Sequence, residues 1–201
     1  MIDIVFPKDN EKEFIKMAER LGLEGLVFVY PAPKDIASFQ KDTKLKISSG
    51  ILCKPEDVRK YKGKFLTLVE APEDQEKIRH IIEQVRPDIL FNLEFTRRKD
   101  FMHHRASGLN HIMAQLAADH DVAIGFNFSA LLSCSQRERA VCLGRMSQNI
   151  MFAKKFRFRA VVASFAASHW KIRAPNDILS FFVAAGTAAD YIKMSLGWVQ
   201  E

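Results

Sequence analysis

The chain has 201 residues and a mass of 23.0 kDa, which fits one domain or a closely packed pair and excludes a long multidomain protein. Hydrophobic residues make up 48% of the chain and the mean hydropathy is −0.10, so the composition supports a folded core and excludes a disordered chain. The 30 basic and 24 acidic residues give a net charge of +6 and a pI near 9.3, which indicates an anionic partner.

Short β-type runs alternate with helical patterns along the whole chain, without a low-complexity tract or a linker rich in Pro, Gly or Ser. This order predicts a single α/β domain over residues 1–201. Seven strands are expected from runs of β-branched and apolar residues bounded by turn residues: Ile2–Val5, Leu26–Tyr30, Leu45–Leu52, Phe65–Glu70, Ile89–Leu93, Val122–Asn127 and Ala160–Ser164.

Helical periodicity is clear in three segments. Glu73–Val85 carries apolar residues at i, i+3, i+4 and i+7 and is followed by Pro87. Ser107–His120 repeats the pattern, and we expect Ser107 to cap its first turn. A long helix is expected from about Gln136 to Arg157.

Strand–helix repeats with parallel strands require helices outside the sheet, and seven strands in this length predict a compact or incomplete TIM-like (β/α) barrel. A doubly wound open sheet is the alternative, although no GxGxxG or GxxxxGK[ST] follows a strand. The strand near Val122–Asn127 alternates bulky and small residues, which is typical of a barrel strand with small residues toward the axis. Its C-terminal Asn127 is either a site residue or a turn cap, and Ser129 has the same two interpretations.

Enzyme sites are weakly indicated. His103, His104 and His111 lie close in the sequence, but there is no HxH or HExxH and Asp100 alone does not complete a metal site, so we expect neither a bound metal nor a catalytic residue. No GxSxG is present, and Cys134 and Cys142 fall in or near apolar helical patterns typical of inert thiols.

One carboxylate pair leaves an alternative open, because Glu70 and Glu94 lie at the ends of neighbouring predicted strands and could meet across a barrel mouth. Three cysteines without a CxxC pair favour a reducing, cytoplasmic location. Early charges after Met1 argue against a signal peptide, and no segment has 18 uninterrupted apolar residues, so no membrane partner is expected.

The positive charge is concentrated in the second half of the chain. Residues 1–96 carry 16 basic and 17 acidic residues, whereas residues 97–173 carry 13 basic and 4 acidic ones, a net charge of +9. Such a partition is uncommon for evenly solvated charge. The excess forms three sets: two follow predicted strands, and one lies on the long helix.

The first set is the segment Arg97–Arg105, which follows the fifth predicted strand. In the second, at 100° per residue, Arg137, Gln148 and Lys155 lie within about 20° of one line and Arg145 lies about 80° away. The third set, Lys171 and Arg173, follows the seventh predicted strand and precedes Pro175. Separate cationic sets favour an extended polyanion such as structured RNA. The candidate RNA-binding residues are Arg97, Arg98, Lys99, His104, Arg105, His111, Asn127, Arg137, Arg145, Lys155, Lys171 and Arg173.

The stretch from His104 to Leu132, HRASGLNHIMAQLAADHDVAIGFNFSALL, resembles the central motif of archaeal ribonuclease P protein component 3, a TIM-barrel family shared with eukaryotic ribonuclease P and MRP. The pattern RMSQNI at Arg145, the strand AVVAS and the start RAPND at Arg173 are also similar to that family, as is Asp3 in the first strand. The resemblance covers nearly the whole chain and is strongest from Arg97 to Asp177.

The resemblance implies an incomplete α/β barrel related to the PHP phosphoesterases. It also implies an accessory subunit of the ribonucleoprotein that removes the 5′ leader of precursor tRNA, in which the RNA subunit carries catalysis with Mg²⁺. Its implied partners are the catalytic ribonuclease P RNA and protein component 2, with precursor tRNA as the substrate of the complex. The first strand here reads Asp3-Ile-Val-Phe-Pro7 without the HxH of PHP enzymes, which speaks against an independent phosphoesterase.

Two other functions remain as alternatives to an RNA-binding subunit. The first is a stand-alone metal-dependent PHP-like phosphoesterase that uses Glu70, Glu94 and the histidines between His103 and His111. The second is a scaffold that binds another protein, in which the positive charge has no role.

Overall fold

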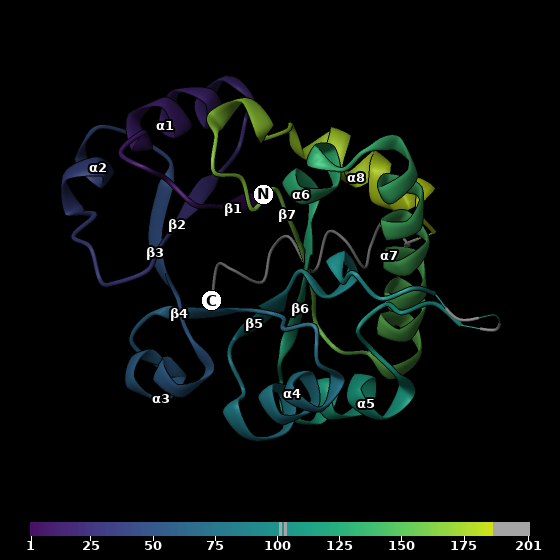
Figure 1. Cartoon of the computed structure of the whole chain (residues 1–201). Coiled ribbons are helices and arrows are strands. Elements are labelled where there is room, and N and C mark those ends of the chain that lie inside the picture. Colours follow the sequence, from purple (N-terminus) through teal and green to yellow (C-terminus); the bar gives the residue numbers. More distant parts are fainter. Residues whose placement is uncertain (101, 103, 187–201) are drawn as a thin grey trace.

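A computed structural model describes residues 1–100, 102 and 104–186 and contains a parallel sheet in the order β1-β2-β3-β4-β5-β6-β7. The sheet curves into a nearly closed barrel with the helices outside it, which confirms the predicted TIM-like fold (Figure 1). Each predicted strand is confirmed to within two residues at either end. The strands are β1 (Ile2–Val5), β2 (Gly25–Tyr30), β3 (Lys46–Leu52), β4 (Leu66–Glu70), β5 (Ile89–Phe91), β6 (Ala123–Asn127) and β7 (Ala160–Ala163).

Helices and short helical turns connect the strands in chain order (Figure 1). The α-helices are α1 (Glu11–Arg20), α2 (Ala37–Lys41), α3 (Val58–Tyr61), α4 (Gln75–His80), α5 (His111–Asp119), α6 (Phe128–Ser133), α7 (Gln136–Phe156) and α8 (Pro175–Ala184). A π-helical segment, η2 (Ile81–Val85), continues α4, and 3₁₀ turns form η1 (Pro55–Asp57), η3 (Leu93–Phe95) and η4 (His169–Lys171). The long predicted helix is confirmed as α7, which begins with a capping box between Ser135 and Glu138.

The predicted start of the helix at Ser107 is wrong. Helix α5 begins at His111, and its cap is Asn110, whose Oδ1 accepts a hydrogen bond from the Met113 amide at 2.9 Å. Gly108 has a φ of +82°, a left-handed conformation that breaks a helix before it reaches Ser107. Ser107 is buried instead and bonds to α7.

Aromatic rings fill the barrel axis at the carboxyl ends of the strands. The rings of Phe91 and Phe165 stack with centroids 5.1 Å apart and an interplanar angle of 3°, and the ring of Phe6 stacks on both at 5.8 and 6.2 Å. Gly125 of β6 faces these rings, while Phe126 packs outward under the helices, as the alternation of that strand predicted. The mouth of the barrel is therefore an apolar plug rather than a polar cavity.

The barrel closes through a short seam between β7 and β1. Val5 and Ala166 form an isolated bridge, in which the Phe6 amide donates to the Ala166 carbonyl at 2.8 Å. Next to it, Asp3 Oδ1 accepts a hydrogen bond from the Ser164 amide at 2.6 Å. Complete burial raises the pKa of Asp3 to about 6, although these hydrogen bonds oppose the shift. A carboxyl group thus replaces part of the missing backbone ladder.

We expect Gly125→Ala to lower the free energy of unfolding by about 1–3 kcal/mol, because the crowded plug cannot accept an added methyl group. A Cβ at this position would lie 2.8 Å from both Phe165 Cζ and Phe91 Cβ. Urea unfolding followed by circular dichroism measures the change. Gly50→Ala in β3 is the control, since its Cβ would meet its nearest atoms at 3.1 Å and should cost less. Equal losses in the free energy of unfolding at the two sites would show that the rings of the plug move to make room for the methyl group.

Candidate nucleic-acid interface

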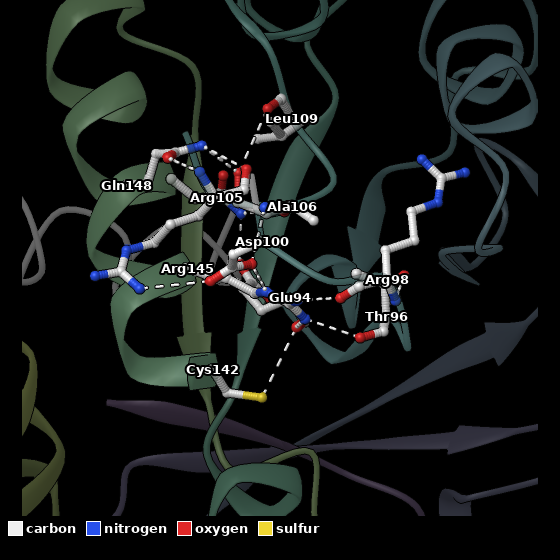
Figure 2. A network of polar contacts seen from close by, with 12 residues as sticks. Glu94, Thr96, Arg98, Asp100, Arg105, Ala106, Leu109, Cys142, Arg145 and Gln148 are labelled. Atoms are coloured by element: carbon white, nitrogen blue, oxygen red, sulfur yellow. Dashed lines mark hydrogen bonds and ion pairs between the residues drawn. The ribbon is translucent and has the colours of Figure 1, made fainter. Parts of the chain in front are cut away.

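The segment that follows η3 lies against helix α7 and is fastened to it by a buried arginine (Figure 2). Arg145 is only 3% exposed. Its Nη1 donates hydrogen bonds to the carbonyls of Glu94 and Thr96 at 3.0 and 2.8 Å, and its Nη2 donates to the carbonyl of Arg98. The planar guanidinium is suited to such a set of acceptors because its five donors have a fixed geometry.

Asp100 completes this contact with a negative charge. Its Oδ1 accepts hydrogen bonds from Arg145 Nε at 2.8 Å and from the Ala106 amide at 3.0 Å, and its Oδ2 lies 3.5 Å from Arg105 Nη1. Partial burial raises the pKa of Asp100, but the hydrogen bonds from Arg145 and Ala106 outweigh burial and hold the pKa below its ordinary value. The ion pair therefore joins both ends of the loop to α7.

Two amides on α7 hold the far end of the loop. Gln148 accepts from the Arg105 amide at 3.1 Å and donates to the Ser107 hydroxyl at 2.8 Å. Asn149 donates to the Ser107 carbonyl at 2.9 Å and to Glu94 Oε1 at 2.7 Å. We call the described part of residues 96–107 the basic loop, and we expect these contacts to restrict its backbone.

Glu94 is fully buried beneath this loop, and burial raises its pKa to about 7 against the opposing hydrogen bond from Asn149. Among the described residues, Glu94 Oε2 and Asn149 Oδ1 both lack a hydrogen-bond partner. Neither of these oxygens is a donor when Glu94 is ionised, whereas a proton on Oε2 would supply one donor beside Asn149, which already contacts the carboxyl through Nδ2. The raised pKa and the unpaired atoms both favour the neutral acid.

The clamped loop presents basic side chains to solvent. Arg97, Lys99 and His104 are exposed, and Figure 2 shows the guanidinium of Arg98 directed away from the cluster while its carbonyl faces Arg145. Arg97 Nε lies 3.9 Å from Glu73 Oε1, an exposed pair that adds little stability. Arg105 is exposed, and its guanidinium lies against Gly144 of α7. A Cβ at position 144 would lie 2.4 Å from Arg105 Cζ.

A hollow of about 510 Å³ lies between the basic loop and the first half of α7, and we call it the loop–α7 hollow. Arg97, Arg98 and Arg137 line it, so two of the three predicted basic sets belong to one surface. Arg137 is in the first turn of α7, where the helix dipole disfavours a cation. It forms no hydrogen bond or ion pair with any described residue, so the fold gives it no structural role.

The other candidate residues lie in different settings. The expectation that Arg145 presents its charge to RNA is wrong, because its guanidinium is buried and bound to the loop. Asn127 is a turn cap, with Oδ1 accepting from the Ala130 amide and Nδ2 donating to Asn92, whereas Ser129 lies inside α6 and caps nothing. His111 begins α5 and is exposed, as is Lys155 near the end of α7.

The third basic set follows β7. Lys171 donates to the Ser133 hydroxyl at the end of α6 at 2.6 Å, and Arg173 donates to the carbonyls of Trp170 and Ile172 at 2.9 and 2.8 Å. Both side chains are half-buried. His103, which the phosphoesterase alternative required, lies outside the described residues.

The remaining parts of that alternative do not come together. Glu70 is exposed and accepts a hydrogen bond from Asn92 at 2.7 Å, whereas Glu94 is buried against α7, so the two carboxylates form no pair across the mouth. Over residues 1–100, 102 and 104–186, no three His, Cys, Asp or Glu side chains are grouped for a metal ion. Within the same residues, no helix is long and apolar enough to span a membrane.

The residues that hold the loop were not predicted, although the pattern contained them. Arg145, Gln148 and Asn149 are spaced i, i+3 and i+4 and therefore lie on one side of α7. A polar stripe that includes an amide at a buried position indicates contact with another backbone segment rather than with water. The offset of Arg145 by about 80° from the exposed Arg137 and Lys155 pointed the same way.

We expect Arg145→Met to lower the free energy of unfolding by about 3 kcal/mol or more, because Asp100 and three carbonyls lose their buried partner. Hydrogen exchange at the amides of Arg105 and Ala106 should accelerate in the same variant. The matched control, Arg137→Met, removes an exposed cation from the same helix and should change the free energy by less than about 0.5 kcal/mol. Unchanged exchange in the first variant would contradict the role of Arg145.

Glu94→Gln should remove part of the pH dependence of stability. A carboxyl group whose pKa is about 7 when folded and 4.5 otherwise binds more protons in the folded state between those values. The wild-type chain therefore loses stability as pH rises from about 4.5 to about 7, by an amount on the order of 3 kcal/mol. The neutral amide should be the more stable form at pH 8, where its NH₂ can donate to Asn149 Oδ1.

Urea unfolding at pH 5 and pH 8 tests this prediction, with the exposed Glu70→Gln as the control. Asp3 also contributes to the wild-type profile, so the difference between variant and wild type is the relevant quantity. Parallel profiles for Glu94→Gln and wild type would contradict a neutral Glu94.

Comparison with known proteins identifies the family. The model of the family described as RNase P subunit p30 matches residues 2–198. Ribonuclease P protein component 3 of Methanocaldococcus jannaschii is 29% identical over 186 residues, which cover 86% of this chain and 77% of that protein. The same component of Methanococcus maripaludis strain C5 is 30% identical, covering 83% and 75%. A chain in a cryo-EM structure of archaeal ribonuclease P with mature tRNA is similar, with a TM-score of 0.79 and 27% identity, over 97% of this chain and 87% of that one. The chain is therefore a member of the RNase P subunit p30 family, as its resemblance to component 3 predicted.

Proposed function

We propose that this chain is a protein subunit of ribonuclease P that binds the catalytic RNA through the basic loop and α7, without catalytic residues of its own. The observation that carries the proposal is the loop–α7 hollow, where Arg97, Arg98 and Arg137 lie together at a position fixed by Arg145. Family membership supports the same function, since the curated relatives are ribonuclease P protein components and the similar solved chain belongs to an archaeal ribonuclease P with mature tRNA.

A fixed backbone improves phosphate binding by these cations. Guanidinium groups hydrogen-bond phosphate oxygens in pairs, and contacts with the phosphate backbone dominate protein affinity for nucleic acids. Because the hydrogen bonds to α7 already order the basic loop, RNA binding has to restrict less of the chain than it would for a free loop. Arg145 therefore raises the affinity for RNA by ordering the basic loop, without itself contacting RNA.

Catalysis in this proposal belongs to the RNA. Removal of the 5′ leader of precursor tRNA requires an activated water and stabilisation of charge at the scissile phosphate, which Mg²⁺ ions held by the RNA can supply. The cations of this chain reduce repulsion between phosphates and favour the compact RNA that holds those ions. Protein component 2 is the proposed protein partner, and the complex works in the cytoplasm, where the three cysteines stay as thiols.

Arg97→Ala with Arg98→Ala should weaken binding to the catalytic RNA and flatten its salt dependence. Each lost phosphate contact is expected to reduce the slope of log K against log salt by about 0.7 to 0.9. Lys41→Ala with Lys44→Ala is the matched control, because Lys41 ends α2, Lys44 lies three residues later and both are exposed. Helix α2 lies on the opposite side of the barrel from α7 (Figure 1). If both double variants keep the wild-type slope and affinity, the basic loop is not the RNA-binding surface.

Reconstitution tests the accessory role itself. Catalytic RNA with this chain and protein component 2 should cleave precursor tRNA at a lower Mg²⁺ concentration than the RNA alone, and the Arg97→Ala, Arg98→Ala variant should lose part of that shift. An unchanged Mg²⁺ requirement on addition of the wild-type chain would overturn the proposed function.

A further inference from the structure

We propose that Trp170 is a stacking platform for an unpaired base of the RNA, with Lys171 and Arg173 placed to contact the adjoining phosphates. This inference rests on the proposed function and extends it to a second surface, at the carboxyl end of β7. Three observations carry it: the exposure of the indole, the backbone contacts that hold its turn, and the two cations that follow it in the chain.

Trp170 is 71% exposed. Among the described residues, the other large hydrophobic side chains at the surface are aliphatic, namely Met102, Ile112, Met151 and Val183. An indole is the largest flat apolar group in proteins, and a soluble chain gains stability by burying it. Its exposure on a described turn of a compact barrel therefore indicates a ligand that covers one of its faces.

The backbone beneath the indole is held on several sides. The turn η4 is closed by a hydrogen bond from the Lys171 amide to the Ser168 carbonyl at 2.9 Å, and Arg173 donates to the Trp170 carbonyl. The ring of His169 lies 4.6 Å from that of Trp170 and packs edge-on against Phe14 of α1, at 6.4 Å. A ligand can stack on this indole without first ordering the turn that carries it.

The surroundings favour a nucleic acid over an apolar partner. Lys171 and Arg173 follow Trp170 by one and three residues, and neither forms an ion pair with a described residue. The apolar Ile172 between them is buried and anchors the segment, so Trp170 is the exposed large hydrophobic side chain of the described segment 165–174. One aromatic face beside cations is the arrangement that holds a single-stranded nucleotide, by stacking on the base and pairing with the phosphate.

The platform lies at the same end of the barrel as the basic loop. β5, β6 and β7 are neighbouring parallel strands, so the basic loop after β5, helix α6 after β6 and the turn η4 after β7 all follow carboxyl ends. Lys171 bonds to Ser133, two residues before the Ser135 cap of α7, which connects η4 to the helix that carries Arg137. One folded RNA can therefore contact both surfaces.

Trp170→Leu should weaken binding to the catalytic RNA by about 5- to 150-fold, the range expected for loss of one stacked base. Trp170→Phe keeps a flat ring and should retain most of the affinity. Since no phosphate contact is lost, the salt slope of Trp170→Leu should equal that of the wild type, unlike the slope of the Arg97→Ala, Arg98→Ala variant. Circular dichroism melting checks that the exposed substitution leaves the fold intact.

Fluorescence gives a direct readout of stacking. The chain has two tryptophans, so in a Trp198→Phe background the emission comes from Trp170 alone. Addition of catalytic RNA should quench it, and addition of protein component 2 without RNA should not. Quenching or a spectral shift caused by component 2 alone would overturn the inference and assign Trp170 to a protein interface.

The failure of this inference can be separated from that of the proposed function. If Trp170→Leu binds RNA as tightly as the wild type while Arg97→Ala, Arg98→Ala binds with a flatter salt slope, the platform is wrong and the basic loop stands. If Trp170→Leu weakens binding at constant slope and the arginine variant has no effect, the platform stands and the RNA-binding surface lies at η4.

Discussion

A guanidinium group that is almost completely removed from water must find partners for its charge and its donors. For Arg145 these partners are Asp100 and the backbone carbonyls of Glu94, Thr96 and Arg98. The bonds reach 45 to 51 residues back along the chain, from the middle of α7 to the segment after β5. Their geometry determines where the backbone of residues 94–100 lies. This backbone position places three basic residues beside α7, namely Arg97, Arg98 and Lys99. An interior ion pair therefore determines where the exposed positive charge lies.

The aromatic plug accounts for why this exterior surface, and not the barrel mouth, is the candidate site. In (β/α) barrels the loops at the carboxyl ends of the strands surround a central depression that holds the substrate. Here Phe6, Phe91 and Phe165 occupy that position, and Gly125 is small enough to let their rings approach. Charged groups cannot lie there without large desolvation costs. They are displaced outward to the basic loop and η4, which suits a macromolecular partner that covers an area rather than a small substrate that enters a pocket.

The strands could be predicted from sequence because parallel strands buried on both faces read as continuous apolar runs, and Ile89–Phe91 and Ala160–Ala163 are of this kind.

The local start of α5 was missed because the left-handed Gly108 overrides the helical pattern around it. Arg145 was misplaced for another reason: a helical wheel assigns charged residues to water unless a distant partner is known. Its partners become neighbours only after the barrel forms, and no local pattern marks Asp100 as one of them. Nothing in the sequence marks Trp170 as exposed, because tryptophan is on average a highly buried residue.

The basic loop has to hold several cations close together. Exposed like charges repel one another, so a loop with Arg97, Arg98, Lys99 and Arg105 would tend to open in the absence of RNA. Asp100 offsets two of the local cations, Arg145 and Arg105, and leaves the outward ones uncompensated by it. The raised pKa of Glu94 acts in the same direction, because the protonated carboxyl adds no negative charge that would offset the outward cations from beneath. The hydrogen bonds to Gln148 and Asn149 then hold the backbone without adding charge. This combination keeps positive potential at the surface while neutralising it in the interior, which is the distribution that an RNA backbone requires.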